Sequence, residues 1–285
     1  MKQAQFYEML ENNKIRCRLC PHECVLPADA TGLCRSRINE GGQLYSLNYA
    51  RVTSVALDPI EKKPLYHFHP GSLILSAGTF GCNFKCGYCQ NWSIAHTDAK
   101  TEKMTPEELA DLAAAYVSRG NIGVAYTYNE PTIWIEFILE TSRLVRERGL
   151  VNVLVTNGFM SPEPLEQLLP LADAMNIDVK AFSEDFYKKY CNGSLAEVKK
   201  TVERAAQSCH VEITTLVIPG LNDSPKEIAE LAQWLSTIDP DIVLHLTRFF
   251  PSFRMNDIPP TPRSTLENAR ESALQYLTHV YIGNI

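Results

Sequence analysis

The feature that most constrains the fold is a regular alternation of short apolar segments with longer amphipathic segments over residues 73–282. The amphipathic segments predict helices; one opens with Thr105-Pro106 followed by Glu108, the pattern of a capping box. Strands that alternate with helices predict a parallel sheet with right-handed crossovers. The expected strands are residues 73–77, 122–128, 151–155, 174–180, 211–218, 242–246 and 279–282. They make about six or seven units, fewer than the eight of a closed barrel, so a partial barrel and a doubly wound sheet both fit.

The first 71 residues have a different character. Residues 1–40 contain four cysteines and little periodic pattern, residues 43–57 alternate and predict a hairpin, and residues 58–72 are rich in proline and charge, as in a connector. Apolar residues make up 45% of the chain, enough to form a sizeable core. We therefore expect a Cys-rich module with a hairpin over residues 1–71 and an α/β domain over residues 72–285.

Polar residues follow the predicted strands at their carboxyl ends, where parallel-sheet enzymes carry their sites. The first strand leads into the segment GCNFKCGYCQ, residues 81–90. The later strand ends carry Asn129 and Glu130, Thr156 and Asn157, Asp178 and Lys180, residues 218–223, and His245 with Arg248. One polar strand end is ordinary, but a succession of them beside a cysteine-rich segment indicates a single site.

Three cysteines in that segment, Cys82, Cys86 and Cys89, have the spacing C-x3-C-x2-C. A structural zinc needs four ligands, whereas a cuboidal iron–sulfur cluster held by three thiolates leaves one iron open to a substrate or cofactor. The sequence therefore favours an open [4Fe–4S] cluster. The alternative is a zinc site completed by a histidine elsewhere, such as His69 or His96.

This spacing, with Tyr88 before the last cysteine, resembles the signature of the radical SAM superfamily, and the resemblance covers roughly residues 72–285. The segments TNGF, DVK and VIPGLND are similar to strand ends of pyruvate formate-lyase activating enzyme. The segments CRLCPHEC, PIEKKPLYHF, GCNFKCGYCQNW and YTYNEP resemble the PflA-like proteins of the AmmeMemoRadiSam group. The resemblance implies an α/β fold with a partial (β/α)6 TIM-like barrel behind the cysteines.

The resemblance also implies an enzyme whose [4Fe–4S] cluster reductively cleaves S-adenosylmethionine to a 5′-deoxyadenosyl radical. That radical would abstract hydrogen from a protein or small-molecule substrate, and Cys82, Cys86 and Cys89 would hold the cluster. The cofactor contacts that the resemblance implies are Tyr88, Asn129, Glu130, Thr156, Asn157, Asp178 and Lys180. The implied partners are an electron donor such as flavodoxin or ferredoxin, and Memo and AMMECR1 family proteins. The alternatives are an activase that makes a glycyl radical and, from another class, a non-catalytic metal-binding scaffold.

A second cysteine set, Cys17, Cys20, Cys24 and Cys34, provides four thiolates within the first 40 residues. Four soft ligands with a short C-x2-C step suit a tetrahedral zinc ion, and a second iron–sulfur cluster is the alternative. A segment of about 40 residues with few apolar anchors needs such a centre to fold. We therefore expect a closed metal site with a structural role.

The remaining properties limit partners and location. A net charge of −6 argues against a nucleic acid as the main partner. We expect a cytoplasmic chain, because no apolar run is long enough to span a bilayer and the N-terminus lacks the apolar centre of a signal peptide. In a reducing compartment most of the nine cysteines are expected to bind metal instead of forming disulfides, with Cys191 and Cys209 as core or surface thiols.

Overall fold

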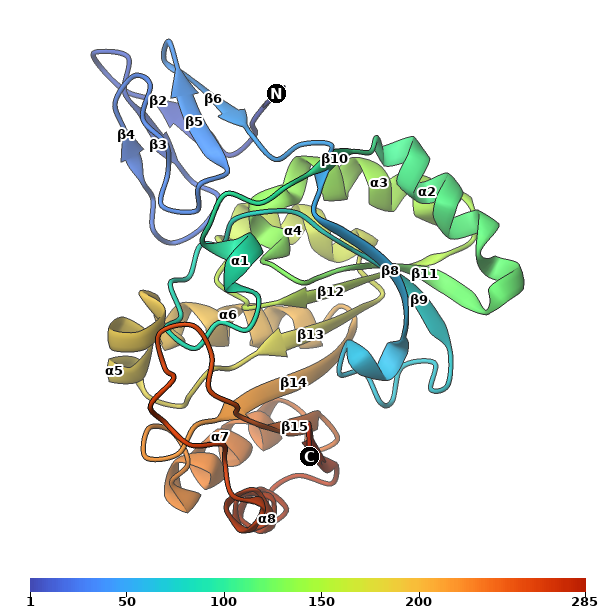
Figure 1. The fold of residues 1–285 in the computed structure, drawn as a ribbon, viewed down its shortest axis with the longest axis vertical. Helices are drawn as coiled ribbons and strands as arrows, with labels where there is room; N and C mark the ends of the chain where they lie inside the picture. The colour runs from blue at the N-terminus through green and yellow to red at the C-terminus, as the bar shows by residue number, and fades with distance from the viewer.

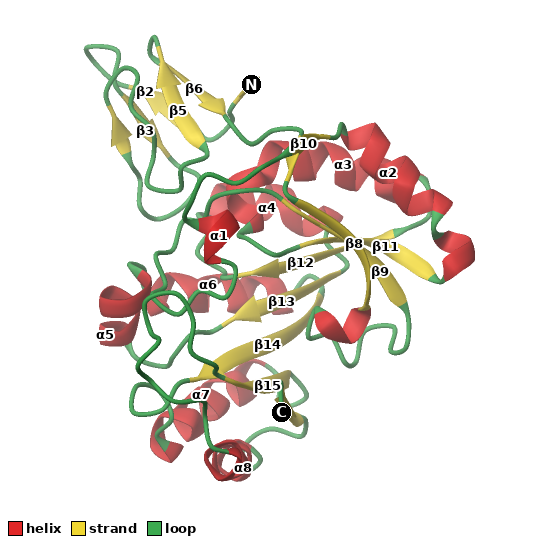
Figure 2. Cartoon of the chain, in the orientation of Figure 1, coloured by secondary structure: helices red, strands yellow, loops and turns green.

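The computed structural model describes residues 1–285 and is dominated by one curved eight-stranded sheet with helices along one side (Figures 1 and 2). Its strands, in chain order, are β8 (Ser54–Pro59), β9 (Leu73–Gly78), β11 (Asn121–Tyr126), β12 (Val151–Thr156), β13 (Ala174–Asp178), β14 (His210–Val217), β15 (Val243–Arg248) and β16 (Val280–Gly283). The main helices are α2 (Pro106–Ala115), α3 (Ile135–Glu147), α4 (Pro162–Leu168), α6 (Leu195–Ala206), α7 (Pro225–Ile238) and α8 (Arg263–Ala273). All seven predicted strands of residues 73–282 are present.

The strand order decides between the two predicted architectures. From one edge to the other the order is β16-β15-β14-β13-β12-β11-β9-β8, and it never reverses. Neighbours from β9 to β16 are parallel, and β8 alone is antiparallel, paired with β9. An order without reversal has no switch point, and right-handed crossovers then place every helix on the same side. The sheet is therefore an open partial barrel and not a doubly wound sheet.

The start of α2 has the capping box that its sequence predicts. At the start of α2, the Thr105 hydroxyl accepts a hydrogen bond from the Glu108 amide at 3.2 Å. The Glu108 carboxylate in turn accepts one from the Thr105 amide at 2.7 Å. This capping box satisfies two amides that the helix itself leaves unpaired. No helix of the chain has both the length and the apolar character that a membrane span requires.

The N-terminal module consists of two three-stranded sheets, seen in blue at one end of Figure 1. They contain β1 (Lys2–Gln3), β5 (Arg37–Glu40) and β6 (Gln43–Ser46), and β2 (Tyr7–Met9), β3 (Ile15–Cys17) and β4 (Val25–Leu26). The hairpin predicted over residues 43–57 is not formed, because β6 pairs with β5 and β1 whereas β8 pairs with β9. The division near residue 71 stays a prediction; β8, which precedes it, belongs to the large sheet.

A buried carboxylate joins the connector to the sheet. Glu212 of β14 is fully buried and accepts hydrogen bonds from the Tyr66 and His67 amides, at 2.9 and 2.7 Å. The rings of His210 and His245 approach the same carboxylate at 2.9 and 2.6 Å. Burial raises the pKa of Glu212, but these hydrogen bonds lower it more, to about 2.

We expect Glu212 to contribute acid-dependent stability. Its folded-state pKa lies below the unfolded value near 4.3, so the contribution is complete above about pH 5 and is lost as the pH falls towards 2. The pKa shift of Glu212 corresponds to about 3 kcal/mol. Between pH 5 and pH 2, the free energy of unfolding should therefore fall by about that much less in Glu212→Gln than in the wild type. Urea unfolding followed by circular dichroism measures this. Glu267→Gln, at an exposed ion pair, should keep the wild-type pH dependence.

Candidate active site

A cavity of about 690 Å³ opens at the carboxyl ends of the strands, on the inner side of the curved sheet. This volume lies within the range of about 300–1,000 Å³ that is usual for small-molecule sites. The predicted residues that line the cavity are Cys82, Cys86, Tyr88, Cys89, Asn129, Glu130, Asn157, Asp178 and Lys180. Thr156 does not line it and lies behind Glu130, to which its hydroxyl donates at 2.7 Å. The structure therefore brings the predicted residues together at one site.

The cysteine loop, residues 79–91 between β9 and the short helix α1 (Trp92–Ala95), is fixed at its start. The Asn129 side chain accepts from the Thr79 amide and donates to the Gly81 carbonyl, both at 3.0 Å. Gly81 has φ +89°, and a Cβ added there would lie 2.4 Å from the Cys34 carbonyl oxygen. The loop thus needs glycine at this position and is held between Asn129 and the N-terminal module.

We expect Gly81→Ala to disturb the loop far more than Gly87→Ala. A Cβ at Gly81 would collide with the backbone of Cys34, whereas the nearest atom to one at Gly87 would be the end of the flexible Met255 side chain, at 3.4 Å. The first variant should lose most of the iron bound at the loop and lower the melting temperature, and the second should stay close to wild type. Iron analysis and thermal unfolding compare the pair. Equal behaviour of the two variants would contradict the close approach at Gly81.

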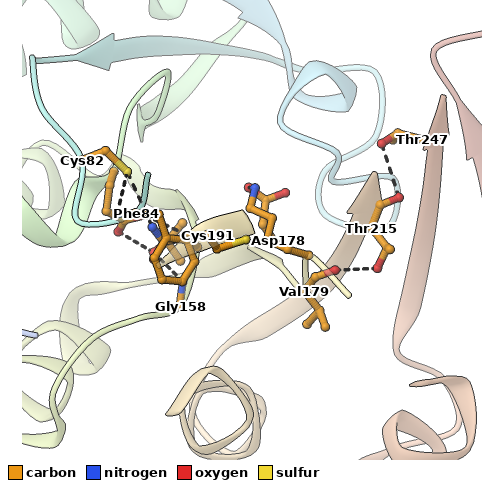
Figure 3. A network of polar contacts seen from close by, with 12 residues as sticks. Cys82, Phe84, Gly158, Asp178, Val179, Cys191, Thr215 and Thr247 are labelled. Carbon is orange, nitrogen blue, oxygen red and sulfur yellow. Dashed lines mark hydrogen bonds and ion pairs between the residues drawn. The ribbon is translucent and has the colours of Figure 1, made fainter. Parts of the chain in front are cut away.

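The three thiols differ in their surroundings. A hydrogen bond from Cys191 lowers the pKa of Cys86, whereas burial raises it. The nearby Lys180 ammonium also lowers this pKa, and the net result lies below the usual value for a thiol. Burial raises the pKa of Cys89 to about 11 and raises that of Cys82 as well. Cys191 is completely buried, as a core thiol was expected to be. Its sulfur lies 3.2 Å from the Tyr88 hydroxyl of the cysteine loop, and Figure 3 shows Cys191 in the view between Cys82 and Asp178.

Glu130 joins the ends of two strands. Its carboxylate is 2% exposed and accepts hydrogen bonds from the Thr132 amide and hydroxyl, the Thr156 hydroxyl and the Asn157 amide, at 2.6 to 2.9 Å. Asn157 continues the chain of contacts, because its side-chain amide donates to the Asn83 side chain at 2.9 Å and lies 3.8 Å from the Cys82 sulfur. Burial raises the pKa of Glu130, against the lowering effect of the Asn157 and Thr132 hydrogen bonds. Both carboxylate oxygens are therefore occupied by groups of the protein.

Asp178 and Lys180 form an ion pair of 2.7 Å that faces the cavity beyond the cysteines. Burial lowers the pKa of Lys180. The negative charges of the Asp178 carboxylate and the Cys86 thiolate raise this pKa by more than burial lowers it, so the amine stays charged. An ammonium and a carboxylate side by side can bind the carboxylate and the hydroxyl or amino groups of one polar ligand.

The inner end of the cavity holds His245, one of the polar strand ends named from the sequence, together with Asp58 and Thr214, which the sequence did not single out for this site. The Asp58 carboxylate accepts from Lys63 Nζ at 2.9 Å and from the Tyr128 hydroxyl at 2.8 Å. Thr214 and His245 line the same space, and the Thr214 hydroxyl is buried without a hydrogen-bond partner. For Thr214 the only available signal was a polar residue inside a largely apolar strand, VEITTLVI.

A segment near the C-terminus covers the cysteine loop. Within residues 249–262, the Arg254 amide donates to the Gly87 carbonyl at 2.9 Å and the Ser252 hydroxyl to the Cys89 carbonyl at 3.1 Å. The Phe253 ring stacks on Trp92, with ring centres 5.5 Å apart. This covering segment limits access of water to the loop, and no motif in its sequence indicated that role.

The histidine alternatives for a zinc site are not supported by a metal-like arrangement. His96 lines the cavity, its pKa is lowered to about 4 by burial and by nearby cations, and its Nδ1 is buried without a partner. The chain contains no group of three or more His, Cys, Asp or Glu side chains in a geometry that could hold one metal ion. The unpaired His96 Nδ1 and Thr214 hydroxyl, together with three thiols, fit a larger polar ligand that includes a thiophilic centre.

Known proteins resemble the chain in sequence and in fold. The family model described as Radical SAM superfamily matches residues 77–233. An uncharacterised protein of Methanocaldococcus jannaschii is 42% identical over 100% of this chain and 86% of its own length. The pyruvate formate-lyase-activating enzyme of Clostridium pasteurianum is 27% identical over 55% of this chain and 67% of its own. The structure of Streptococcus suis SuiB bound to S-adenosylmethionine superposes with a TM-score of 0.59 at 14% identity, covering 74% of this chain and 51% of that chain.

Proposed function

This chain belongs to the radical SAM superfamily, whose members use a [4Fe–4S] cluster and S-adenosylmethionine, and from that premise we propose that it is an enzyme of radical chemistry. When bound, cluster and cofactor supply one-electron cleavage of the sulfonium to a 5′-deoxyadenosyl radical that takes hydrogen from a substrate. The observation that supports this proposal best is one cavity shared by Cys82, Cys86, Cys89 and the Asp178–Lys180 ion pair. A scaffold without activity would not need a polar cavity beside its thiolates.

The proposed roles follow from the contacts of each side chain. Cys82, Cys86 and Cys89 hold the cluster, and Lys180 pairs with the carboxylate of the cofactor while Asp178 accepts from its hydroxyl groups. Tyr88 contacts the adenine through its backbone, because its hydroxyl is already paired with Cys191 at 3.2 Å.

Asn129, Glu130, Thr156 and Asn157 have a supporting role in this proposal. Their side chains bind one another, the cysteine loop and the strand ends, so they position the loop instead of giving up those bonds to the cofactor. The covering segment excludes water from the reacting atoms. The inner end of the cavity, with Lys63, Thr214 and His245, receives the substrate.

The substrate is a protein or a small molecule, and an electron donor such as flavodoxin or ferredoxin supplies the electron. The similarity to an activating enzyme supports glycyl-radical formation in a partner enzyme as a second candidate function. The AmmeMemoRadiSam-like segments support Memo and AMMECR1 family proteins as partners in place of such an enzyme.

Anaerobic reconstitution followed by electron paramagnetic resonance tests the proposal. The reduced cluster signal should change when S-adenosylmethionine is added, and 5′-deoxyadenosine should accumulate with dithionite as reductant. An unchanged signal without deoxyadenosine would favour the non-catalytic scaffold. A glycyl-radical signal that appears in a co-purified partner enzyme would identify the activase function.

A further inference from the structure

We infer that Cys17, Cys20, Cys24 and Cys34 hold a second iron–sulfur cluster, through which electrons enter the site. All four cysteines line one small cavity inside the N-terminal module. The inference rests on the proposed function for its role, because that function requires an electron, but the presence of the cluster is independent of it.

The local backbone directs the four sulfurs into the same space. Cys17 and Cys24 are neighbours across the β3–β4 hairpin, with the Cys17 amide donating to the Cys24 carbonyl at 3.0 Å. Cys20 lies in the turn between them, where its carbonyl accepts from Glu23. Cys34 comes from a separate loop, in which the Gly32 amide donates to the Arg37 carbonyl at 2.8 Å. Four thiolates from two loops form a closed ligand set.

A buried arginine beside the sulfurs points to a bound centre. Arg37 lines the same cavity and is 1% exposed; it pairs with Glu136 at 2.7 Å and donates to the Ile133 carbonyl at 3.1 Å. Its Nε is buried with no partner among the protein atoms. Buried donors are almost always paired, and a metal-bound thiolate accepts N–H hydrogen bonds that set the potential of an iron–sulfur cluster.

The surroundings of the four cysteines favour a cluster over zinc. Zinc has no redox chemistry and would give the module a structural role alone. An iron–sulfur cluster exchanges single electrons at a potential that hydrogen bonds to its sulfurs set, and the unpaired Arg37 Nε in the same cavity supplies such a donor.

The N-terminal module packs directly against the cysteine loop of residues 79–91, on both sides of Cys82. Before Cys82, the Cys34 carbonyl lies against Gly81, as described above. After it, the His22 ring donates to the Asn83 carbonyl at 2.8 Å. Cys24 is partly exposed. The second centre is therefore next to the cysteine loop and also reaches the surface, as an electron relay has to.

The redox step balances without bond changes. A reduced one-electron donor of the flavodoxin or ferredoxin class loses one electron, and the cluster of the N-terminal module gains it. The same electron then passes to the centre at Cys82, Cys86 and Cys89, and the N-terminal cluster returns to its oxidised state. Each turnover thus consumes one electron from the external donor.

The full chain with Cys82, Cys86 and Cys89 all changed to alanine tests the metal. Purified anaerobically, it should contain about four irons and four sulfides per chain, and its reduced resonance signal should not respond to S-adenosylmethionine. One zinc per chain without sulfide, or no metal, would overturn the inference. Because this variant cannot use the cofactor, the result does not depend on the proposed function.

The relay is tested with Cys24→Ala/Cys34→Ala, compared with Cys209→Ala at a half-buried thiol far along the chain. Cofactor cleavage driven by reduced flavodoxin should fall at least about tenfold in the double variant, while cleavage driven by dithionite stays within about twofold. Equal losses with both reductants would mean a structural role and would overturn the relay. Circular dichroism and the signal of the remaining cluster verify folding, and a wild-type chain inactive with dithionite would contradict the proposed function alone.

Discussion

Replacing Cys86 by alanine should abolish formation of 5′-deoxyadenosine. Cys86 is the middle ligand of the proposed cluster and has the thiol whose pKa is lowered, so it is the most readily deprotonated of the three. Without it, two thiolates remain for a cubane that already has one open iron, and the cluster cannot persist in an active form. Chromatographic assay of deoxyadenosine with dithionite as reductant measures the loss.

Cys191→Ala is the matched control for this variant. Cys191 is a completely buried thiol beside Tyr88 and Cys86, so its removal makes a small cavity and alters the same neighbourhood without removing a ligand. The control should keep the signal change on cofactor addition and most of the turnover. Turnover that survives in Cys86→Ala, or is lost equally in the control, would refute the assignment of Cys86 as a ligand.

The sequence predicted the parallel domain well because its signals are local. Apolar strands, capped helices and polar strand ends are properties of short segments, and the structure contains each expected strand. The choice between a partial barrel and a doubly wound sheet could not be made, because strand order depends on which segments pair across the fold. The failed hairpin over residues 43–57 has the same cause: β8 alternates as a hairpin strand would, but its partner β9 comes later in the chain.

The site was predictable where residues end or closely follow a strand, as for Asp178, the last residue of β13, and Lys180 shortly after it. At its inner end the sequence named His245 but missed Thr214, because the direction of the Thr214 side chain depends on the register of β14 against β15. The covering segment was missed for another reason. Its hydrogen bonds to Gly87 and Cys89 are accepted by backbone carbonyls, which leave no mark in the residue types.

Arg37→Met should destabilise the metal-free protein by about 3–5 kcal/mol. Arg37 and Glu136 are both 1% exposed and are joined at 2.7 Å, so the single variant leaves the Glu136 charge buried without its partner. The effect should be large at neutral pH because an unpaired buried carboxylate cannot be hydrated. Urea unfolding followed by circular dichroism gives the free energy, and metal-free protein is used so that loss of a bound centre does not contribute.

The double variant Arg37→Met/Glu136→Leu separates the cost of an unpaired charge from the value of the pair. Two apolar side chains of similar volume should recover most of the lost stability, less about 1 kcal/mol for the Gln5 amide, which now donates to Glu136 at 2.9 Å. Arg263→Met, in a pair with 72% and 51% exposed side chains, should change stability by less than about 1 kcal/mol. If the double variant is as unstable as Arg37→Met, the pair itself, and not the isolated charge, holds the N-terminal module to α3.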